Sequence, residues 1–514
     1  MKRREFALAV LTAAVCHGQI RPGGLPKLGT VDARFQSYNV EMVEVTGGRF
    51  WAPYRPDTKK PAEAPPAAAL SAPAIDPAAF RQREPINLAN PRLRKLAAAL
   101  GPAYVRVSGT WANSTFFHDS DAPAPAAPPA GFGGVLTRAQ WRGVLDFSRA
   151  VDAKLVTSFA ISAGVRDAQG VWTPSEATKI LAATWSAGGS IAAAEFFNEP
   201  NIAAMGGAPA GYTAASYGRD FQVFRAFAKK AAPEMTILGP GSVGEGTGMS
   251  GMAMLSSTEM LKAGGADVDA YSYHYYGSVS KRCAYIAAMK QTTPEAALSA
   301  AWLNKTGQEA TFYIGLRDQY EAGKPIWLTE TGETACGGNP WAAGFLDSFR
   351  YLDQLGQLAK KGVQVVAHNT LAASDYALID EVTLTPRPNY WAALLWHRTM
   401  GSTVLDAGPS PAPEVRLYAH CLADKPGGVG LLAINTDRGA EHDLDLPIGS
   451  QTFTLTAANL EGGPVQLNGR ELKLGANDAI PALKGRPAKP GKLPLAPASI
   501  TFLAVPSAGN PACR

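Results

Sequence analysis

The sequence predicts an α/β protein: a (β/α)8 TIM barrel followed by a C-terminal β-sandwich domain. Short apolar or β-branched runs alternate with segments of helical periodicity from Ser37 to about residue 402. Eight such runs occur, which favours a closed barrel over an open, doubly wound sheet. Beyond Gly401 the helical periodicity ends, and β-like runs are separated by Gly, Pro and Asn/Asp turns, as in an all-β sandwich.

The barrel strands are expected in chain order at 38–45, 104–109, 155–161, 193–199, 236–240, 268–276, 325–330 and 363–371. Helices are expected near 91–100, from about 137, at 175–187 and at 217–231. The β domain follows with strands at 415–422, 428–435, 443–446, 451–457, 465–474 and 499–505. The chain then divides into an export signal (1–18), a segment that supplies a strand to the β domain (19–34), the catalytic barrel (35–402) and the β-sandwich domain (403–514).

Two insertions interrupt this pattern, at 53–85 and 122–134, and both are rich in Pro and Ala. They lie in loops of the face where a barrel carries its chemistry. Loops this long in a compact domain are usually functional or mobile. A role at the site and plain linker-like decoration are both compatible with their composition.

Composition excludes several functional classes. The 514 residues are 46% hydrophobic and 18% charged, enough to bury a sizeable core. The net charge is +5 and the Lys and Arg residues are scattered, which argues against a nucleic-acid partner. No stretch after the N-terminus is apolar over the ~20 residues that a membrane span needs.

The first 18 residues resemble an export signal. A basic segment, Lys2-Arg3-Arg4, precedes a short apolar run at 6–15, and Arg3-Arg4-Glu5-Phe6 fits a twin-arginine signal. We therefore expect a periplasmic or secreted protein. Cys16 allows a lipoprotein reading, although Val15 is a poor lipobox residue, and an untranslocated N-terminus is a further alternative.

The sequence has five cysteines, namely Cys16, Cys283, Cys336, Cys421 and Cys513. Their spacing matches no metal site and no redox motif. Export would allow disulfides, and Cys283 and Cys336, in candidate barrel loops, can pair. Free, packed thiols are an equally good interpretation.

A first candidate catalytic carboxylate lies at Glu199. Phe196 and Phe197 are bulky strand formers, and Pro200 cannot donate to a sheet ladder, so the strand ends before it. Asn198 and Glu199 are then expected at the carboxyl end of strand four, where barrels carry their chemistry. The alternative is a surface Glu in a turn before a proline.

A second carboxylate, Glu330, ends the predicted seventh strand, 131 residues after Glu199. Parallel barrel strands point the same way, so both groups project from one face. Such a pair suits glycoside hydrolysis with retention, with roughly 5–5.5 Å between the carboxyl groups. We assign Glu199 as acid/base, because the amide of Asn198 can hold a sugar 2-hydroxyl, and Glu330 as nucleophile.

Two other glutamates compete with this pair. Glu333 lies only three residues after Glu330, but past the predicted strand end. Glu195 is expected in mid-strand, as a partnered residue of the barrel core, because an isolated buried charge is costly. Neither is therefore preferred as a catalytic group.

The chain resembles glycoside hydrolase family 79, the heparanase and β-glucuronidase family, as a bacterial member. The resemblance covers most of the barrel and the β domain. The matching motifs are Trp327-Leu328-Thr329-Glu330-Thr331, Cys336-Gly337-Gly338, Ala342-Ala343-Gly344-Phe345, Leu352-Asp353-Gln354-Leu355-Gly356, Ala373-Ser374-Asp375-Tyr376-Ala377-Leu378-Ile379-Asp380 and Asn389-Tyr390-Trp391-Ala392-Ala393-Leu394-Leu395.

The resemblance implies roles for further residues. The N–H groups of Gly337 and Gly338, with the Tyr376 hydroxyl, would hold a uronate carboxylate, since oriented amides bind anions without a formal charge. An ordinary turn and a plain core aromatic are the alternatives. Tyr275, in the run 273–276, would lie beside the nucleophile, and neighbouring His274 would be structural.

Other implied contacts lie nearer the N-terminus. Glu41 on the first strand would contact sugar hydroxyls, although a solvated strand-end Glu is as good an interpretation. The turn Gly109-Thr110 after strand two would also contact substrate. The resemblance implies no metal and no organic cofactor.

We expect an exo-acting, retaining β-glucuronidase that acts on terminal glucuronate of a glycan or glycoside. An endo-acting, heparanase-like enzyme is the nearest alternative. Family members that cut heparan sulfate carry basic clusters, whereas here the loop charges, such as Lys281 and Arg282, are scattered. A non-catalytic carbohydrate-binding protein and a barrel glycosidase for a neutral sugar (a β-xylosidase or arabinofuranosidase) are further alternatives.

Overall fold

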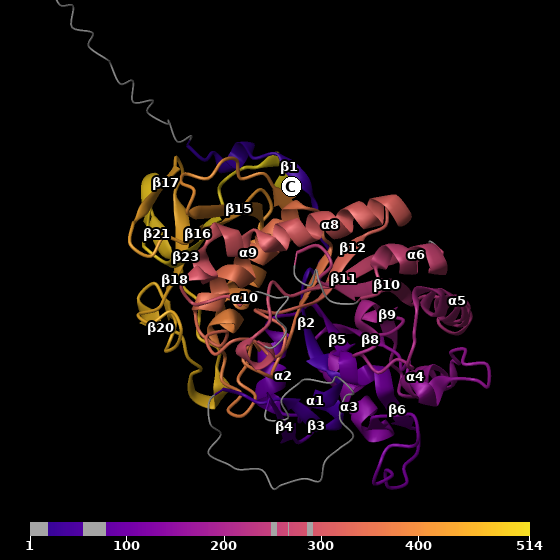
Figure 1. The fold of residues 1–514 in the computed structure, drawn as a ribbon. Helices are drawn as coiled ribbons and strands as arrows, with labels where there is room; N and C mark the ends of the chain where they lie inside the picture. Colours follow the sequence, from indigo (N-terminus) through magenta and orange to yellow (C-terminus); the bar gives the residue numbers. More distant parts are fainter. Residues whose placement is uncertain (1–18, 55–78, 248–253, 266, 285–290) are drawn as a thin grey trace, which may run out of the picture.

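The computed structural model describes residues 19–54, 79–247, 254–265, 267–284 and 291–514 (Figure 1). The expected export signal with Cys16, and most of the first insertion (55–78), lie outside the described residues.

Eight parallel strands close into a barrel, as the sequence predicts. In order around the barrel they are β2 (Gln36–Glu41), β5 (Ala103–Ser108), β8 (Ala153–Ser158), β9 (Ile191–Glu195), β10 (Thr236–Val243), β11 (Ala270–Tyr275), β12 (Ile326–Thr331) and β13 (Val365–His368). Closure comes from β13, which pairs with β2 in parallel register, for example Ala367 opposite Ser37. Because all eight strands run the same way, their carboxyl ends form one rim.

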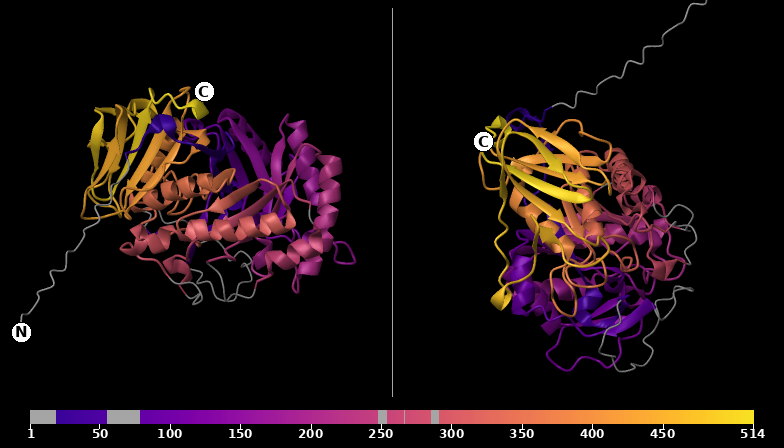
Figure 2. Two further views of the ribbon diagram at one scale, coloured as in Figure 1. Left: turned by 90° about the horizontal axis from the view of Figure 1, so that it is seen from above. Right: turned by 90° about the vertical axis from the view of Figure 1, so that its left-hand side faces the viewer.

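Helices cover the outside of the barrel (Figures 1 and 2). They are α2 (Pro91–Ala98), α3 (Arg138–Ala150), α4 (Ser175–Ser186), α5 (Ala214–Ala231), α6 (Ser257–Gly264), α7 (Ala300–Leu303), α8 (Lys305–Tyr320), α9 (Leu346–Lys360) and α10 (Pro388–Thr399). The start of α3 shows how local sequence sets an end. The Thr137 hydroxyl accepts from the Gln140 N–H, and the Gln140 side chain accepts from the Thr137 N–H, which is a capping box.

Several predicted barrel strands end earlier than expected, and two of these ends bear on the site. The first was expected to reach residue 45, but β2 stops at Glu41 and a short helix, α1 (Met42–Thr46), follows. The Glu44 carboxylate accepts from the Glu41 N–H at 2.7 Å, so this cap outweighs the β propensity of the two valines in α1. The fourth strand, β9, stops at Glu195, which is therefore its last residue and not in mid-strand.

Two small sheets extend the loops of the carboxyl rim. The described part of the first insertion forms β4 (Phe80–Arg83), which pairs with β3 (Gly48–Trp51). After β5, β6 (Thr115–His118) pairs with β7 (Gly134–Thr137).

The C-terminal part forms an antiparallel sheet of nine strands. It contains β1 (Lys27–Thr30), β14 (Met400–Leu405), β15 (Val415–Leu422), β16 (Val429–Asn435), β23 (Ser499–Val505), β18 (Ser450–Thr456), β19 (Gln466–Leu467), β20 (Arg470–Glu471) and β21 (Arg486–Ala488). A second, two-stranded sheet of β17 (His442–Leu446) and β22 (Gly491–Leu495) contributes leucines to an apolar cluster with the nine-stranded sheet.

One predicted strand of this domain is wrong. The run 465–474 is a hairpin, β19–β20, and not one strand. Asn468 and Gly469 both have positive φ (51° and 78°), which is the backbone of a tight hairpin turn. Asn-Gly is the pair that such a turn favours, so the signal was present in the sequence.

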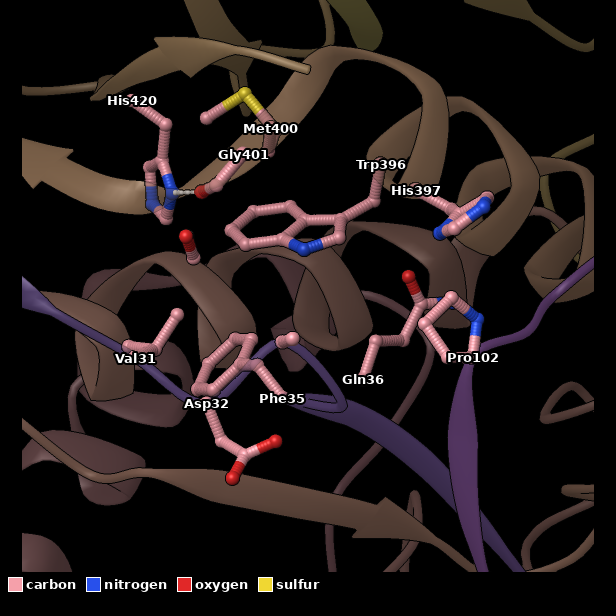
Figure 3. A pocket seen from close by; sticks show the side chains of 12 residues that line it. Val31, Asp32, Phe35, Gln36, Pro102, Trp396, His397, Met400, Gly401 and His420 are labelled. Atoms are coloured by element: carbon pink, nitrogen blue, oxygen red, sulfur yellow. Dashed lines mark hydrogen bonds between the residues drawn. The ribbon is translucent and has the colours of Figure 1, made fainter. Parts of the chain in front are cut away.

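The other face of the nine-stranded sheet packs on α9 and α10, which separate it from the barrel (Figures 1 and 2). A Cβ at Gly356 of α9 would lie 2.4 Å from the Tyr418 ring of β15, so the contact needs glycine. A cavity of about 40 Å³ remains at this junction, lined by Trp396, His397 and His420 among others (Figure 3).

The two ends of the described chain meet at this sheet. Asn510 donates from Nδ2 to the carbonyls of Pro22 and Leu25, at 2.8 and 2.9 Å. A disulfide joins Cys421 to Cys513. Among the described residues, no helix has both the length and the apolar character to cross a membrane.

Candidate active site

Glu199 and Glu330 meet at the carboxyl rim of the barrel. Glu330 is the penultimate residue of β12, and Glu199 lies four residues beyond the end of β9. One carboxylate oxygen of each, and one ring nitrogen of His274, lie within 4.8 Å of one another. Both glutamates are nearly buried, 8% and 6% exposed.

The loop that carries Glu199 is held in an uncommon conformation. Glu199 has φ 49° and ψ 62°, in the left-handed region that few non-glycine residues adopt. Asn113 stabilises the residue before it, because its side chain accepts from the Asn198 N–H (2.8 Å) and donates to the Asn198 carbonyl (2.9 Å). Asn113 therefore fixes both the N–H and the carbonyl of Asn198, the residue that precedes Glu199.

Arg106 of β5 lies between the buried carboxylates. It donates to Glu195 Oε2 (2.8 Å), Glu330 Oε2 (2.8 Å) and Asn198 Oδ1 (2.7 Å). Burial opposes its charge, yet Glu195 and then Glu330 raise the pKa of Arg106 above its already high ordinary value. Arg106 is thus a permanent cation in the barrel interior.

Glu195 is partnered, as expected for a buried charge. Besides Arg106 it accepts from the hydroxyls of Ser272 (2.9 Å) and Thr329 (2.6 Å). Burial alone would raise the pKa of Glu195, but Arg106 and then His274 hold this pKa well below its usual range. Glu195 is therefore ionised and serves to hold Arg106 and its neighbours.

His274 of β11 lies directly between the two candidate catalytic groups. Its Nδ1 is 3.1 Å from Glu199 Oε1 and 3.8 Å from Glu330 Oε2. Burial would lower its pKa, but the carboxylates of Glu330 and Glu195 raise the pKa of His274 to about 9. A protonated His274 is thus a site residue, and not merely the structural histidine that we expected.

The two carboxylates differ in their surroundings. Glu330 accepts from Arg106 Nη1 (2.8 Å) and from the Tyr276 hydroxyl (2.9 Å). Burial, and then the charge of Glu330, raise the pKa of Glu199, against the lowering effect of its hydrogen bond with His274. A raised pKa suits the carboxyl group that has to donate a proton.

The tyrosine beside Glu330 is Tyr276, and the placement of Tyr275 there is wrong. Side chains alternate along a strand, and on β11 Ser272 and His274 point into the barrel. Tyr275 therefore points outward with Tyr273, whose ring stacks on Tyr313 of α8 (4.7 Å). Tyr276, one residue further, returns to the inner side.

Asn369, which follows β13, joins several site residues. Its Nδ2 group lies 3.0 Å from Glu41 Oε1, 2.9 Å from the Tyr276 hydroxyl and 3.1 Å from the Tyr376 hydroxyl. Among the described residues, Asn369 Oδ1 and Glu41 Oε2 are buried with no hydrogen-bond partner. Two unsatisfied polar atoms beside Glu330 can bind hydroxyl groups of a ligand.

Gly109 allows Glu41 to lie where it does. A Cβ at Gly109 would be 1.6 Å from Glu41 Oε2, and Gly109 has φ 89°, so this position requires glycine twice over. Burial, and then Glu330, raise the pKa of Glu41 well above its ordinary value. Thr110 begins the short 3-10 helix Thr110–Ser114 next to this contact.

Gly337 and Gly338 form a turn with positive φ at both residues (82° and 81°). Within the described chain, neither of their N–H groups donates a hydrogen bond. Burial raises the pKa of Glu333 to about 7, and its carboxylate accepts from the Asn339 N–H (2.8 Å) and side chain (3.2 Å). Glu333 therefore closes this loop and does not join the pair Glu199 and Glu330.

The set Glu199, His274 and Glu330 also offers three atoms of the type that bind metal ions. Arg106 and a protonated His274 already supply positive charge at these carboxylates. A metal ion would have to displace the proton of His274, since imidazole binds metals in its neutral form. The donors therefore fit a hydrogen-bonded pair of carboxylates better than a metal site.

Four site residues were not predicted from the sequence, namely Arg106, Asn113, Tyr276 and Asn369. A signal existed for two of them. Arg106 is a charge in an otherwise apolar strand, and Tyr276 has the parity of His274 on β11. Asn113 and Asn369 lie in irregular segments, where no periodicity indicates direction.

Comparisons with known proteins identify the family of the chain. The model of the glycosyl hydrolase family 79 N-terminal domain matches residues 85–356. Heparanase-like protein 1 of Arabidopsis thaliana is 28% identical over 381 residues, 71% of this chain and 67% of that protein. Baicalin-β-D-glucuronidase of Scutellaria baicalensis is 34% identical over 189 residues, 35% and 36% of the two chains.

A solved structure shares the fold. The 4-O-α-L-rhamnosyl-β-D-glucuronidase of Fusarium oxysporum matches with a TM-score of 0.63 and covers 94% of this chain and 99% of that one. Its sequence identity is 14%, so the likeness concerns architecture alone.

Proposed function

The chain belongs to glycosyl hydrolase family 79, and on this basis we propose that it is a retaining, exo-acting β-glucuronidase. It would remove terminal glucuronic acid from a glycan or glycoside by double displacement. The observation that carries the proposal is the close approach of Glu199 and Glu330, within 4.8 Å. A close pair of carboxylates suits a nucleophile and an acid/base, as in retaining enzymes.

The reaction proceeds in two steps. The Glu330 carboxylate attacks the anomeric carbon while Glu199 gives its proton to the leaving oxygen. Glu199, now ionised, then takes a proton from water, and the water oxygen displaces Glu330. The Asn198 Oδ1 atom accepts from Arg106, which leaves the NH2 of this amide to donate to the sugar 2-hydroxyl.

A uronate is supported by the N–H groups of Gly337 and Gly338. Two backbone donors without partners among the described residues suit an anion, and the Tyr376 hydroxyl, which accepts from Asn369, has its own proton to donate. The relative named baicalin-β-D-glucuronidase agrees with a glucuronide. A neutral-sugar glycosidase would gain nothing from Tyr376, so Tyr376→Phe should spare its activity.

Action at a chain end is supported by burial and by the state of Arg282. The two carboxylates are almost inaccessible, and the Arg282 guanidinium, a cation that a sulfated polymer could use, is paired with Asp375 (2.5 Å). The relative named heparanase-like protein 1 favours the endo-acting alternative. Rapid release from an aryl β-glucuronide without shortening of heparan sulfate supports exo action; shortened chains without free glucuronate would refute it.

The catalytic assignment is tested with Glu330→Gln. This variant keeps the size of the side chain and its capacity to accept from Arg106, so the fold should persist while turnover on the aryl glucuronide is lost. Unchanged turnover would refute the assignment. A folded, inactive wild type that still binds glucuronides would favour the non-catalytic alternative.

We further propose that the protein is exported. The disulfides Cys283–Cys336 and Cys421–Cys513 fit an oxidising compartment. Replacing Arg3 and Arg4 with lysine should retain the protein in the cytoplasm if the signal is of the twin-arginine type. Equal export of the variant would contradict that type of signal.

A further inference from the structure

The Gly337–Gly338 turn is held by contacts to its carbonyl groups. In a trans peptide the C=O and the following N–H point in opposite directions. Holding the carbonyls of Cys336 and Gly337 therefore fixes where the N–H groups of Gly337 and Gly338 point. These are the two donors that the proposed function assigns to the uronate carboxylate.

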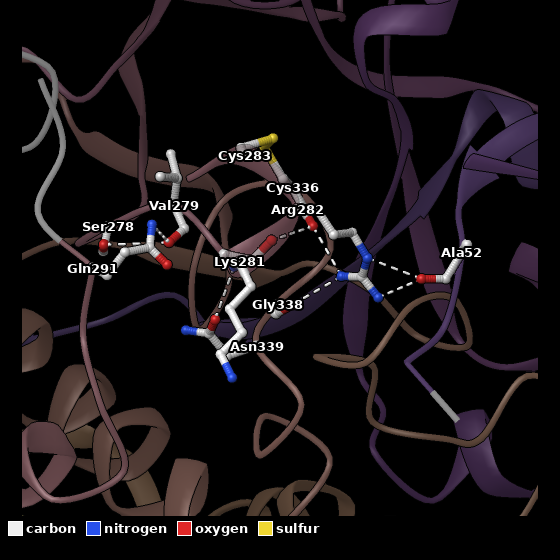
Figure 4. The surroundings of a disulfide bond; sticks show 11 residues. Ala52, Ser278, Val279, Lys281, Arg282, Cys283, Gln291, Cys336, Gly338 and Asn339 are labelled. Atoms are coloured by element: carbon white, nitrogen blue, oxygen red, sulfur yellow. Dashed lines mark hydrogen bonds between the residues drawn. A yellow bond between two sulfur atoms is a disulfide. The ribbon is translucent and has the colours of Figure 1, made fainter. Parts of the chain in front are cut away.

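Arg282 makes most of these contacts (Figure 4). Its Nη1 donates to the Cys336 carbonyl (3.0 Å) and to the Gly338 carbonyl (2.9 Å). The Gly337 carbonyl accepts from the backbone N–H of Asp375 (3.1 Å), whose carboxylate accepts from Arg282 Nη2 (2.5 Å). One guanidinium thus acts, directly or through Asp375, on three consecutive carbonyls.

The position of Arg282 is itself fixed. Its Nε donates to the Ala52 carbonyl (2.9 Å), and its Cζ lies 3.8 Å from the centre of the Tyr54 ring. The side chain is 5% exposed. The next residue, Cys283, is bonded to Cys336, so a covalent bond joins the segment of Arg282 to the turn (Figure 4).

We propose that Arg282, supported by the Cys283–Cys336 disulfide, is a positioning residue that aims the N–H groups of Gly337 and Gly338 and thereby sets the preference for a uronate over a neutral sugar. The inference rests on the proposed function. It assigns to Arg282 an action through the backbone, and not an ion pair with the substrate, because Asp375 already neutralises the guanidinium.

The test compares para-nitrophenyl β-D-glucuronide with its neutral methyl ester. The ratio of kcat/KM for the acid to that for the ester measures recognition of the carboxylate. Arg282→Gln and Arg282→Lys should both lower this ratio by about tenfold to a hundredfold, the range for lost hydrogen bonds to a charged group. Lysine keeps the charge but cannot reproduce the planar fork of donors, so rescue by lysine would overturn the proposal in favour of simple charge attraction.

The second disulfide offers a matched control. Cys283→Ser/Cys336→Ser should lower the acid-to-ester ratio, whereas Cys421→Ser/Cys513→Ser, in the β domain, should lower thermal stability and leave the ratio unchanged. If the Arg282 variants do not fold, the acid-to-ester ratios of the two double variants test the proposal.

Two further outcomes, besides rescue by lysine, overturn the inference. One is an unchanged ratio in the folded Arg282 variants, and the other is an equal loss on acid and ester, which indicates a general structural role. A wild type that is folded but inactive on the glucuronide contradicts the proposed function itself, and the two failures are thus distinguishable.

Discussion

At the scale of single residues, the site is an arrangement of two cations among three buried carboxylates. Arg106 contacts Glu195 and Glu330, and His274 contacts Glu195 and Glu199. An unpaired buried charge would be costly, so the cations make it possible to keep several carboxylates in one water-poor site. Among the described contacts Arg106 forms no ion pair with Glu199, which suits the group that must hold a proton.

On the other side of Glu330, the uncharged Asn369 side chain joins three site residues. Its amide lies within hydrogen-bond distance of Glu41, Tyr276 and Tyr376. A tyrosine hydroxyl that accepts from Asn369 donates its own proton to another group. The Tyr276 hydroxyl donates to Glu330.

We therefore expect Asn369→Ala to lower kcat/KM on an aryl glucuronide by about tenfold to a hundredfold, because both tyrosines lose their common donor. Asn435 is the control, since it is equally buried and its Nδ2 lies 3.0 Å from three carbonyls of the β domain. Asn435→Ala should cost stability, measured by urea unfolding, without changing kcat/KM of the folded protein. Equal kinetic losses in the two variants would contradict a local role for Asn369.

At the scale of elements, the ends of the strands decide which groups meet. β2 ends at Glu41 because the capping box with Glu44 turns the chain into α1. The neighbouring strand β5, in register through Glu41 opposite Ser108, ends just before Gly109. The close approach of Glu41 to Gly109 thus depends on where two strands stop.

Gly109→Ala is expected to lower turnover, and the loss should exceed what its lower stability explains. The added Cβ must displace the Glu41 carboxylate, and the left-handed backbone costs a further ~1 kcal/mol. Gly170→Ala is the matched control, because Gly170 also has positive φ (71°) but nothing within 4 Å of the added atom. Gly170→Ala should lose about 1 kcal/mol of unfolding free energy and Gly109→Ala more than this, and only Gly109→Ala should lose turnover. Similar turnover in both would show that Glu41 is not required at this position.

At the scale of the whole molecule, the barrel and the nine-stranded sheet share one apolar core. Trp396 of α10, Leu432 of β16 and Phe502 of β23 belong to it. His420 of β15 lies at this junction, buried, with Nδ1 2.6 Å from the Gly401 carbonyl and its ring against Trp396 (Figure 3). Burial lowers the pKa of His420 to about 4, so it is neutral in the folded protein near neutral pH.

This burial predicts acid sensitivity of the junction. Below its ordinary pKa of 6.5 the unfolded chain binds a proton at His420, whereas the folded protein does not until pH 4. The contribution of His420 is fully present above pH 6.5 and is lost as the pH falls to 4. At 1.36 kcal/mol per pH unit it amounts to about 3 kcal/mol.

His420→Gln keeps a donor for the Gly401 carbonyl and does not titrate. Urea unfolding at pH 7 and pH 4.5 should therefore show a smaller loss of stability on acidification in the variant than in the wild type. Parallel losses would show that His420 does not titrate across this range.

Much of this protein follows from its sequence, because the features concerned are local. Alternation of apolar runs with helical periodicity predicts eight βα units, and a Glu that closes or shortly follows an apolar run predicts each member of the pair Glu199 and Glu330. The Cys336-Gly337-Gly338 motif likewise indicates a turn. Each of these depends only on neighbours along the chain.

What only the tertiary structure decides is which side chains meet across the barrel. Arg106 and Glu330 are 224 residues apart and Asn369 and Glu41 are 328 apart, so their contacts depend on closure of the barrel. The choice between Tyr275 and Tyr276 depends on a shift of one residue, and such a shift reverses the direction of a side chain. Similarly, the role of Arg282 depends on the meeting of its own loop with the loops that carry Gly337 and Asp375. Every residue has a backbone carbonyl, so the sequence does not indicate which carbonyls Arg282 contacts.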